Sequence, residues 1–117
     1  MKREVLFDYI QDNFKSKPEY LWNKFSSYAV FRHPNSDKWF ALVMNISGDK
    51  FDLKTNEKVD VLNVKVRPEH VGSLRLRDGI YPAYHMNKEH WISILLNNSM
   101  SENEIFGLLN ESYDLTA

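Results

Sequence analysis

Apolar residues recur at four-residue spacing near the start of the chain, where Leu6, Ile10 and Phe14 form one stripe. This spacing places them on one face of a helix, so the pattern predicts an amphipathic helix from Lys2 to Lys15. Lys17-Pro18 follows. Because proline cannot continue the hydrogen-bond ladder of a helix, we expect the helix to end there.

The next periodic segments are rich in aromatic and β-branched residues, which favour strands. Tyr28–Arg32 and Lys38–Ile46 flank the turn-forming segment His33–Asp37, and together they predict a β-hairpin. A third strand is predicted at Val59–Val66. Asn63 interrupts its alternating valines, and this mixed pattern indicates a strand that is covered largely on one side.

The rest of the chain alternates short helical and extended patterns. Pro68 is well placed in the first turn of a short helix that Asp78-Gly79 ends. Trp91–Leu96 is a further apolar strand, followed by a polar turn. Ser101 and Glu104 fit a capping box, so the last helix is predicted from Ser101 to Tyr113.

The predicted order is helix, hairpin, strand, helix, strand, helix, with short connections. This order indicates an α+β fold in which helices cover one face of an antiparallel sheet and leave the other face partly open. A chain of 117 residues is expected to form a single domain, spanning residues 1–117.

Composition narrows the class of protein without identifying a function. There is no cysteine, which excludes disulfides, thiolate metal sites and cysteine nucleophiles. Charges interrupt the N-terminal residues and the apolar runs are short, so we expect a cytoplasmic, soluble monomer with no membrane partner. A net charge of −1 argues against strong non-specific binding of nucleic acid, although residues 65–91 carry five basic against three acidic residues.

Candidate chemistry concentrates in the segment Pro82–Trp91, which we call the joint. It holds two of the four histidines, where a plain connection would carry glycine, serine and aspartate. In a structural interpretation, Asn87 caps a turn by accepting from the amide of Glu89 or His90, and Trp91 anchors the joint in the core. In a functional interpretation, the joint presents three polar side chains to a partner, namely Tyr84, His85 and Lys88.

Several motifs resemble the MmcQ/YjbR family of small bacterial proteins. They are Asn63-Val64-Lys65, Gly79-Ile80, Pro82–Lys88, His90-Trp91-Ile92 and Glu111–Leu115, with a looser match at Trp39–Leu42. The signature His-Met-Asn-Lys-x-His-Trp is the most specific of them. The resemblance implies a CyaY-like α+β fold, in two layers, and a DNA-binding role of the double-wing kind, with no enzymatic activity to carry over.

The leading functional prediction is therefore a non-enzymatic DNA-binding protein that uses a modest basic patch around the joint. Cations would neutralise phosphates, while an aromatic ring could stack on a base. The predicted nucleic-acid-binding residues are Lys65, Arg67, Arg75, Arg77, Tyr84, His85, Asn87 and Lys88. The alternative is a protein-interaction or small-ligand adaptor that uses the Tyr84–Trp91 part of the joint, which suits the near-neutral net charge better. A set of cations that only keeps the domain soluble stays open as well.

Enzymatic and metal chemistry have little support in the sequence. His85 and His90 are five residues apart, which does not match the zinc-protease pattern, and there is no Gly-rich phosphate loop. We therefore predict no catalytic residue, no metal site and no cofactor. Glu4, Asp8 and Asp12 resemble the acidic, iron-binding ridge of frataxin-like proteins, but a solvent-facing helix stripe is the simpler interpretation.

Aromatic residues crowd the first 40 positions, at Phe7, Phe14, Trp22, Phe25, Phe31, Trp39 and Phe40. Most are expected to pack in the core, since a small domain with few large aliphatic residues must fill its interior. An exposed pair such as Trp22 and Phe25 would instead mark a protein-docking patch ahead of the first strand.

Overall fold

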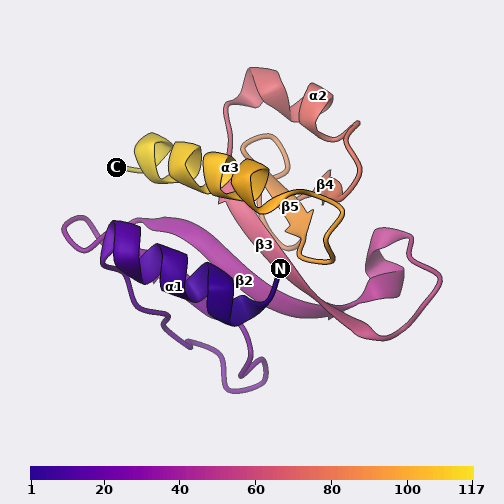
Figure 1. The fold of residues 1–117 in the computed structure, drawn as a ribbon, viewed down its shortest axis with the longest axis horizontal. Coiled ribbons are helices and arrows are strands. Elements are labelled where there is room, and N and C mark those ends of the chain that lie inside the picture. Colours follow the sequence, from indigo (N-terminus) through magenta and orange to yellow (C-terminus); the bar gives the residue numbers. More distant parts are fainter.

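A computed structural model describes residues 1–117 and shows a five-stranded antiparallel sheet with helices on one face (Figure 1). The strands are β1 (Ala29–Arg32), β2 (Trp39–Ser47), β3 (Lys58–Lys65), β4 (Ile80–Pro82) and β5 (Trp91–Leu95), in the spatial order β1-β2-β3-β5-β4. The helices are α1 (Arg3–Phe14), α2 (Val71–Leu74) and α3 (Glu102–Leu115), with 3-10 turns η1 (Gly48–Phe51) and η2 (Pro68–His70). The predicted α+β class and antiparallel sheet are confirmed.

Several local predictions are also confirmed. β1 and β2 form the predicted hairpin. Ser101 caps α3, because its Oγ accepts a hydrogen bond from the Glu104 amide at 3.2 Å. Ile105 and Leu109 of this helix are buried. No helix has both the length and the apolar character that crossing a membrane requires.

The differences from the sequence-based expectations have local causes. α1 ends at Phe14 because Lys15 is left-handed (φ 53°), three residues before Pro18. β4 and η1 were not predicted, since segments of three or four residues are too short to show a period. The expectation for β3 is wrong: its residues 61–64 are all buried, because this central strand is covered on both faces.

The first face of the sheet, which the helices cover, carries the main core. Leu6 and Ile10 of α1 and Leu109 of α3 are fully buried against it. The two helices lie side by side (Figure 1), and the rings of Tyr9 and Phe106 stack between them with centroids 3.8 Å apart. Helix packing therefore leaves the opposite face of the sheet to other segments.

One buried hydroxyl of α3 joins the ends of β2 and β3. Ser112 Oγ donates to the Phe40 carbonyl oxygen at 2.7 Å and accepts from the Lys65 N–H at 2.8 Å. The register of β2 with β3 ends at Ala41 and Val64, one residue short of these two groups. The hydroxyl therefore takes the place of a ladder bond between backbone groups that would otherwise be buried without partners.

His33 is buried where the β1–β2 turn meets the end of α3. Its Nε2 lies 2.7 Å from Thr116 Oγ1, and its ring packs against Tyr113 with centroids 4.1 Å apart. Burial lowers the pKa of His33 below its ordinary value; a backbone hydrogen bond to Tyr113 opposes this shift, and the charge of Lys38 adds to it. The folded protein therefore favours the neutral imidazole.

We expect the free energy of unfolding to fall as the pH drops below about 6.5, the ordinary pKa of histidine. Below that pH, His33 binds a proton in the unfolded chain but not in the folded protein. The contribution of His33 to the free energy of unfolding is therefore complete above about pH 6.5 and declines until the pH reaches the lowered pKa. Each unit of lowering corresponds to about 1.4 kcal/mol. Urea unfolding of the wild type and of His33→Asn from about pH 5 to 8 measures the effect. The same pH slope in both proteins would contradict it.

Candidate functional site

The second face of the sheet, opposite the helices, is covered by irregular segments. Apolar side chains of the strands and of η1 form a cluster on it: Val30, Leu42, Met44, Ile46, Phe51, Val61 and Leu95. Larger side chains, mostly aromatic, pack over this cluster from the segment before β1, from the start of β2 and from the joint: Trp22, Tyr28, Trp39, Tyr84 and Met86. The face is therefore partly covered, and it stays hollow where the covering segments meet.

Two buried polar side chains of this face fix the start of the joint. Asn63 of β3 and Ser93 of β5 pair directly across the strands, and both are 0% exposed. Asn63 Nδ2 donates to the Tyr84 carbonyl oxygen at 2.9 Å, and the Tyr84 N–H donates to Ser93 Oγ at 2.9 Å. The same hydroxyl donates to Asn63 Oδ1. Both backbone polar groups of Tyr84 are thereby bound to the sheet.

The joint turns sharply after this anchor. His85 has a left-handed backbone (φ 62°), and its ring lies 4.0 Å from the ring of Tyr84. Asn87 Oδ1 accepts from the Glu89 N–H at 2.8 Å, so the predicted cap is confirmed. His85 is exposed and Met86 is half-buried. The turn therefore holds His85 and Met86 at the surface of the second face.

Seven side chains enclose a hollow of about 480 Å³ on this face, which we call the aromatic pocket. Its floor comes from β2, one wall from the segment before β1, and the other wall from the joint. Trp39 and Leu42 form the floor, Trp22, Phe25 and Tyr28 form the wall from the segment before β1, and His85 and Met86 form the wall from the joint. A rigid floor with walls from irregular segments is a common construction for ligand sites.

Trp22 is the central ring of the pocket. Its plane lies at 89° to that of Trp39, with centroids 5.9 Å apart, and at 73° to that of Tyr28, with centroids 6.1 Å apart. Phe25 stacks on Tyr28 at 4.8 Å and remains 48% exposed. The rings therefore support one another while part of their surface faces solvent.

The pocket has polar atoms but no fixed charge in its lining. The indole, phenol and imidazole groups of Trp22, Tyr28 and His85 form no hydrogen bond inside the protein. Burial raises the pKa of Tyr28, and the nearby Tyr84 adds to the shift, so its hydroxyl stays protonated and can donate. These groups are available to a ligand.

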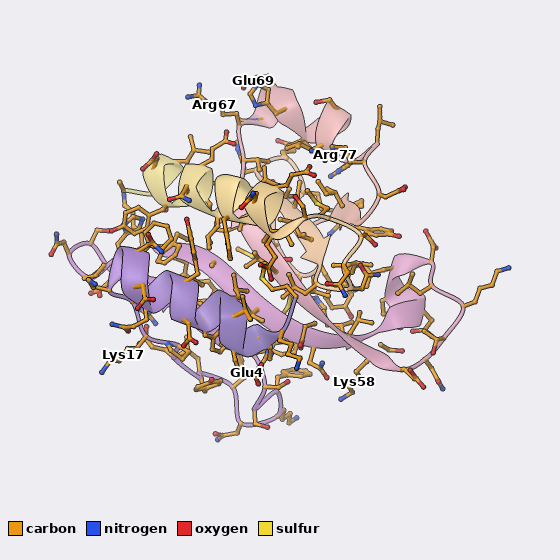
Figure 2. All side chains as sticks on the ribbon, in the orientation of Figure 1. Glu4, Lys17, Lys58, Arg67, Glu69 and Arg77 are labelled. Atoms are coloured by element: carbon orange, nitrogen blue, oxygen red, sulfur yellow. The ribbon has the colours of Figure 1, made fainter.

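The structure places the predicted cations in different surroundings. Arg67 Nε lies 3.8 Å from Glu111 Oε1 and Arg77 contacts the Glu104 carboxylate, and both glutamates belong to α3. Figure 2 shows Arg67 and Arg77 at opposite ends of the η2–α2 segment. These two arginines therefore turn toward the helix layer.

Arg75 and Lys88 are brought together instead. Arg75 Nη2 donates to the Lys88 carbonyl oxygen at 2.7 Å, and both side chains line a hollow of about 530 Å³. Lys88 also lines a groove of about 270 Å³ with Lys50 and Tyr84. Arg75, Lys88 and Lys50 form no ion pair. Lys65 lines neither hollow and is in register with Trp91 across β3 and β5.

The acidic stripe of α1 is solvent-exposed at Glu4, Asp8 and Asp12. The structure gathers no group of three or more histidine or carboxylate side chains that could hold a metal ion.

The sequence singles out Trp22 and Phe25 as a possible docking patch, but it does not predict that Trp39 lies beside them. The reason is a bulge: the pairing of β1 with β2 passes from Phe31–Ala41 to Arg32–Trp39 and skips Phe40. Phe40 then packs in the main core, and Trp39 turns to the second face. Strict alternation along β2 would place Trp39 on the helix-covered face. The crowding of aromatic residues in the first 40 positions was therefore the only sequence signal for this pocket.

Together these observations define a small α+β protein with an aromatic pocket on the sheet face opposite its helices. The chain belongs to the YjbR family, which matches residues 15–115. It is 40% identical to the uncharacterised protein YyaQ of Bacillus subtilis over 116 residues, covering 99% of this chain and 98% of YyaQ. It is 32% identical to YbdF of Escherichia coli O157:H7, over 83% of this chain and 70% of YbdF.

Solved structures agree with this assignment. A crystal structure of a Pseudomonas syringae protein matches with a TM-score of 0.97 and 50% identity, over 100% of both chains. A Deinococcus radiodurans protein matches with a TM-score of 0.68 over 92% of this chain and 75% of that one. At 23% identity, this second match shows the fold alone.

Proposed function

We propose that this protein is a non-enzymatic binding protein whose ligand occupies the aromatic pocket. The observation that carries the proposal is a hollow of about 480 Å³ with aromatic walls and a sheet floor. Small-molecule sites typically measure about 300–1,000 Å³ and are mostly apolar, with a few polar groups that orient the ligand. The free groups of Tyr28 and His85 supply the polar part. His85 has no hydrogen-bonded partner to orient it, so the geometry favours binding over acid–base chemistry.

Two-dimensional NMR with a small-fragment library tests this proposal. We expect hits at millimolar concentration that shift the indole N–H signals of Trp22 and Trp39. The signal of Trp91, which does not line the pocket, should stay in place. If no fragment moves the two pocket indoles, the pocket is not a ligand site.

A matched pair of variants separates the pocket from its surroundings. Phe25 lines the pocket and Tyr20 does not, although both are exposed aromatic residues of the segment before β1 (48% and 53%). Phe25→Ser should weaken fragment binding by about tenfold, as the loss of one aromatic contact and its buried area implies. Tyr20→Ser should leave it unchanged.

A second candidate function is the binding of nucleic acid, which the family resemblance implies together with a CyaY-like architecture. Arg75, Lys88 and Lys50, which lack carboxylate partners, favour it: Lys50 and Lys88 line a groove with Tyr84, and Arg75 contacts Lys88. Three phosphate contacts would give a log–log salt slope of roughly −3 for duplex DNA. The sites predicted at Lys65, Arg67, Arg77, His85 and Asn87 remain part of this second proposal.

Fluorescence anisotropy with a labelled duplex, at low and moderate salt, tests the nucleic-acid candidate. Lys50→Ala/Lys88→Ala should weaken binding and reduce the slope by about two units. Lys17→Ala is the control, because Lys17 lies near the C-terminal end of α1 (Figure 2). An unchanged anisotropy at about 100 µM protein in low salt would exclude this function.

A further inference from the structure

We propose that the aromatic pocket selects a planar, uncharged aromatic ring that carries one hydrogen-bonding group. This inference rests on the proposed binding function and names the chemical class of its ligand. Ring geometry, charge and hydrogen bonding each contribute to it independently.

The crossed indoles provide the shape selection. Because Trp22 and Trp39 lie at 89° to each other, a flat ring that is parallel to one of them is perpendicular to the other. Such a ligand forms an offset stack with one indole and an edge-to-face contact with the other, and aromatic pairs favour both arrangements. A saturated ring of the same size fills the same space but forms neither contact. The Met86 thioether, beside the rings, adds a further contact that favours aromatic ligands.

The charge of the surroundings selects against ionic ligands. No aspartate, glutamate, lysine or arginine lines the pocket. A charged ligand would therefore lose its hydration without gaining an ionic partner. Aromatic faces attract cations, but the Arg32 guanidinium, which pairs with Glu19 Oε2 at 2.8 Å, already lies over the Trp39 ring, 6.0 Å from its centroid, and occupies a position that a cationic ligand would use.

The hydrogen-bonding group follows from the two polar side chains of the walls. The Tyr28 hydroxyl and the His85 ring come from two different segments of the chain, and neither forms a hydrogen bond inside the protein. The imidazole and the phenol can each donate a hydrogen bond, so one hydroxyl, amide or ring nitrogen on the ligand can pair with either. A ligand without such a group would leave these atoms unpaired on binding.

Four compounds on one ring skeleton test the inference: β-naphthol, its saturated analogue decahydro-β-naphthol, the anion β-naphthoate and the cation β-naphthyltrimethylammonium. Calorimetry gives the affinities, and the indole signals of Trp22 and Trp39 report the site, with Trp91 as the internal control. We expect β-naphthol to bind about tenfold more tightly than each of the other three. Trp22→Leu keeps an apolar wall but removes one indole, so it should abolish the preference for the planar ring over the saturated one.

The possible outcomes distinguish a failure of this inference about the ligand class from a failure of the proposed binding function. Equal affinity for the saturated analogue, or tighter binding of either ion, overturns the ligand class but leaves the pocket as a binding site. If none of the four compounds shifts the Trp22 and Trp39 signals at about 1 mM, the inference fails, and if the fragment library also fails, so does the proposed function.

Discussion

Asn63→Leu is expected to lower the free energy of unfolding by about 2–4 kcal/mol. Leucine fits the volume but cannot donate to the Tyr84 carbonyl or accept from Ser93 Oγ, and Asn63 is fully buried. Each buried polar group left without a partner costs about 1–3 kcal/mol. Urea unfolding, with an unchanged dependence on denaturant, measures this loss.

The same substitution should release the joint from the sheet, so the pocket wall at His85 and Met86 should loosen. Asn87→Ala is the matched control, because Asn87 is exposed and its side chain serves only the turn within the joint. It should cost about 1 kcal/mol or less. A cost for Asn63→Leu as small as this would show that the buried network does not hold the joint.

Ser112→Ala is expected to cost about 2–4 kcal/mol, because it leaves the Phe40 carbonyl and the Lys65 N–H buried without partners. Alanine is the better helix former, which offsets a few tenths of a kcal/mol of this loss. Ser73→Ala is the control: Ser73 is exposed and its hydroxyl donates to the His70 carbonyl in a surface turn. We expect it to change stability by less than about 0.5 kcal/mol.

Thermal unfolding and hydrogen exchange read out the Ser112 prediction at two levels. The melting temperature reports the total loss, and the exchange rates of β2 and β3 amides show whether the ends of those strands open first. If both variants melt alike, the bridging hydroxyl contributes no more than a surface serine. Faster exchange confined to the Lys65 end of β3 would locate the effect where the structure places it.

The elements that the sequence predicted well are those with long, regular periods. α1, α3 and the β1–β2 hairpin have repeated apolar positions or a capping residue, and their predicted bounds differ from the observed ones by one or two residues. β4 has three residues and no period of its own. The burial of β3 on both faces could not be predicted, because it depends on segments distant in sequence that cover the second face.

The candidate site was less accessible to sequence reasoning than the fold. The joint was identified by its composition, and the cap at Asn87 was predicted from side-chain chemistry. The pocket itself depends on a one-residue bulge at Phe40, which moves Trp39 to the other face. Local sequence preferences do not reveal such a bulge, since it arises from the fit of both aromatic rings to two different cores.

The hydrogen bonding of the two edge strands, β1 and β4, affects how the protein behaves at high concentration. On β1, Val30 exchanges both backbone hydrogen bonds with Glu19 at 2.9 Å, and the Arg32 carbonyl accepts from Ser16 Oγ at 2.8 Å. On β4, Pro82 has no N–H to offer, and the Ile80 N–H already donates to the Arg77 carbonyl. Neither border of the sheet thus presents a row of free donors and acceptors to a neighbouring molecule. The protein should resist lateral sheet growth and aggregation through strand pairing.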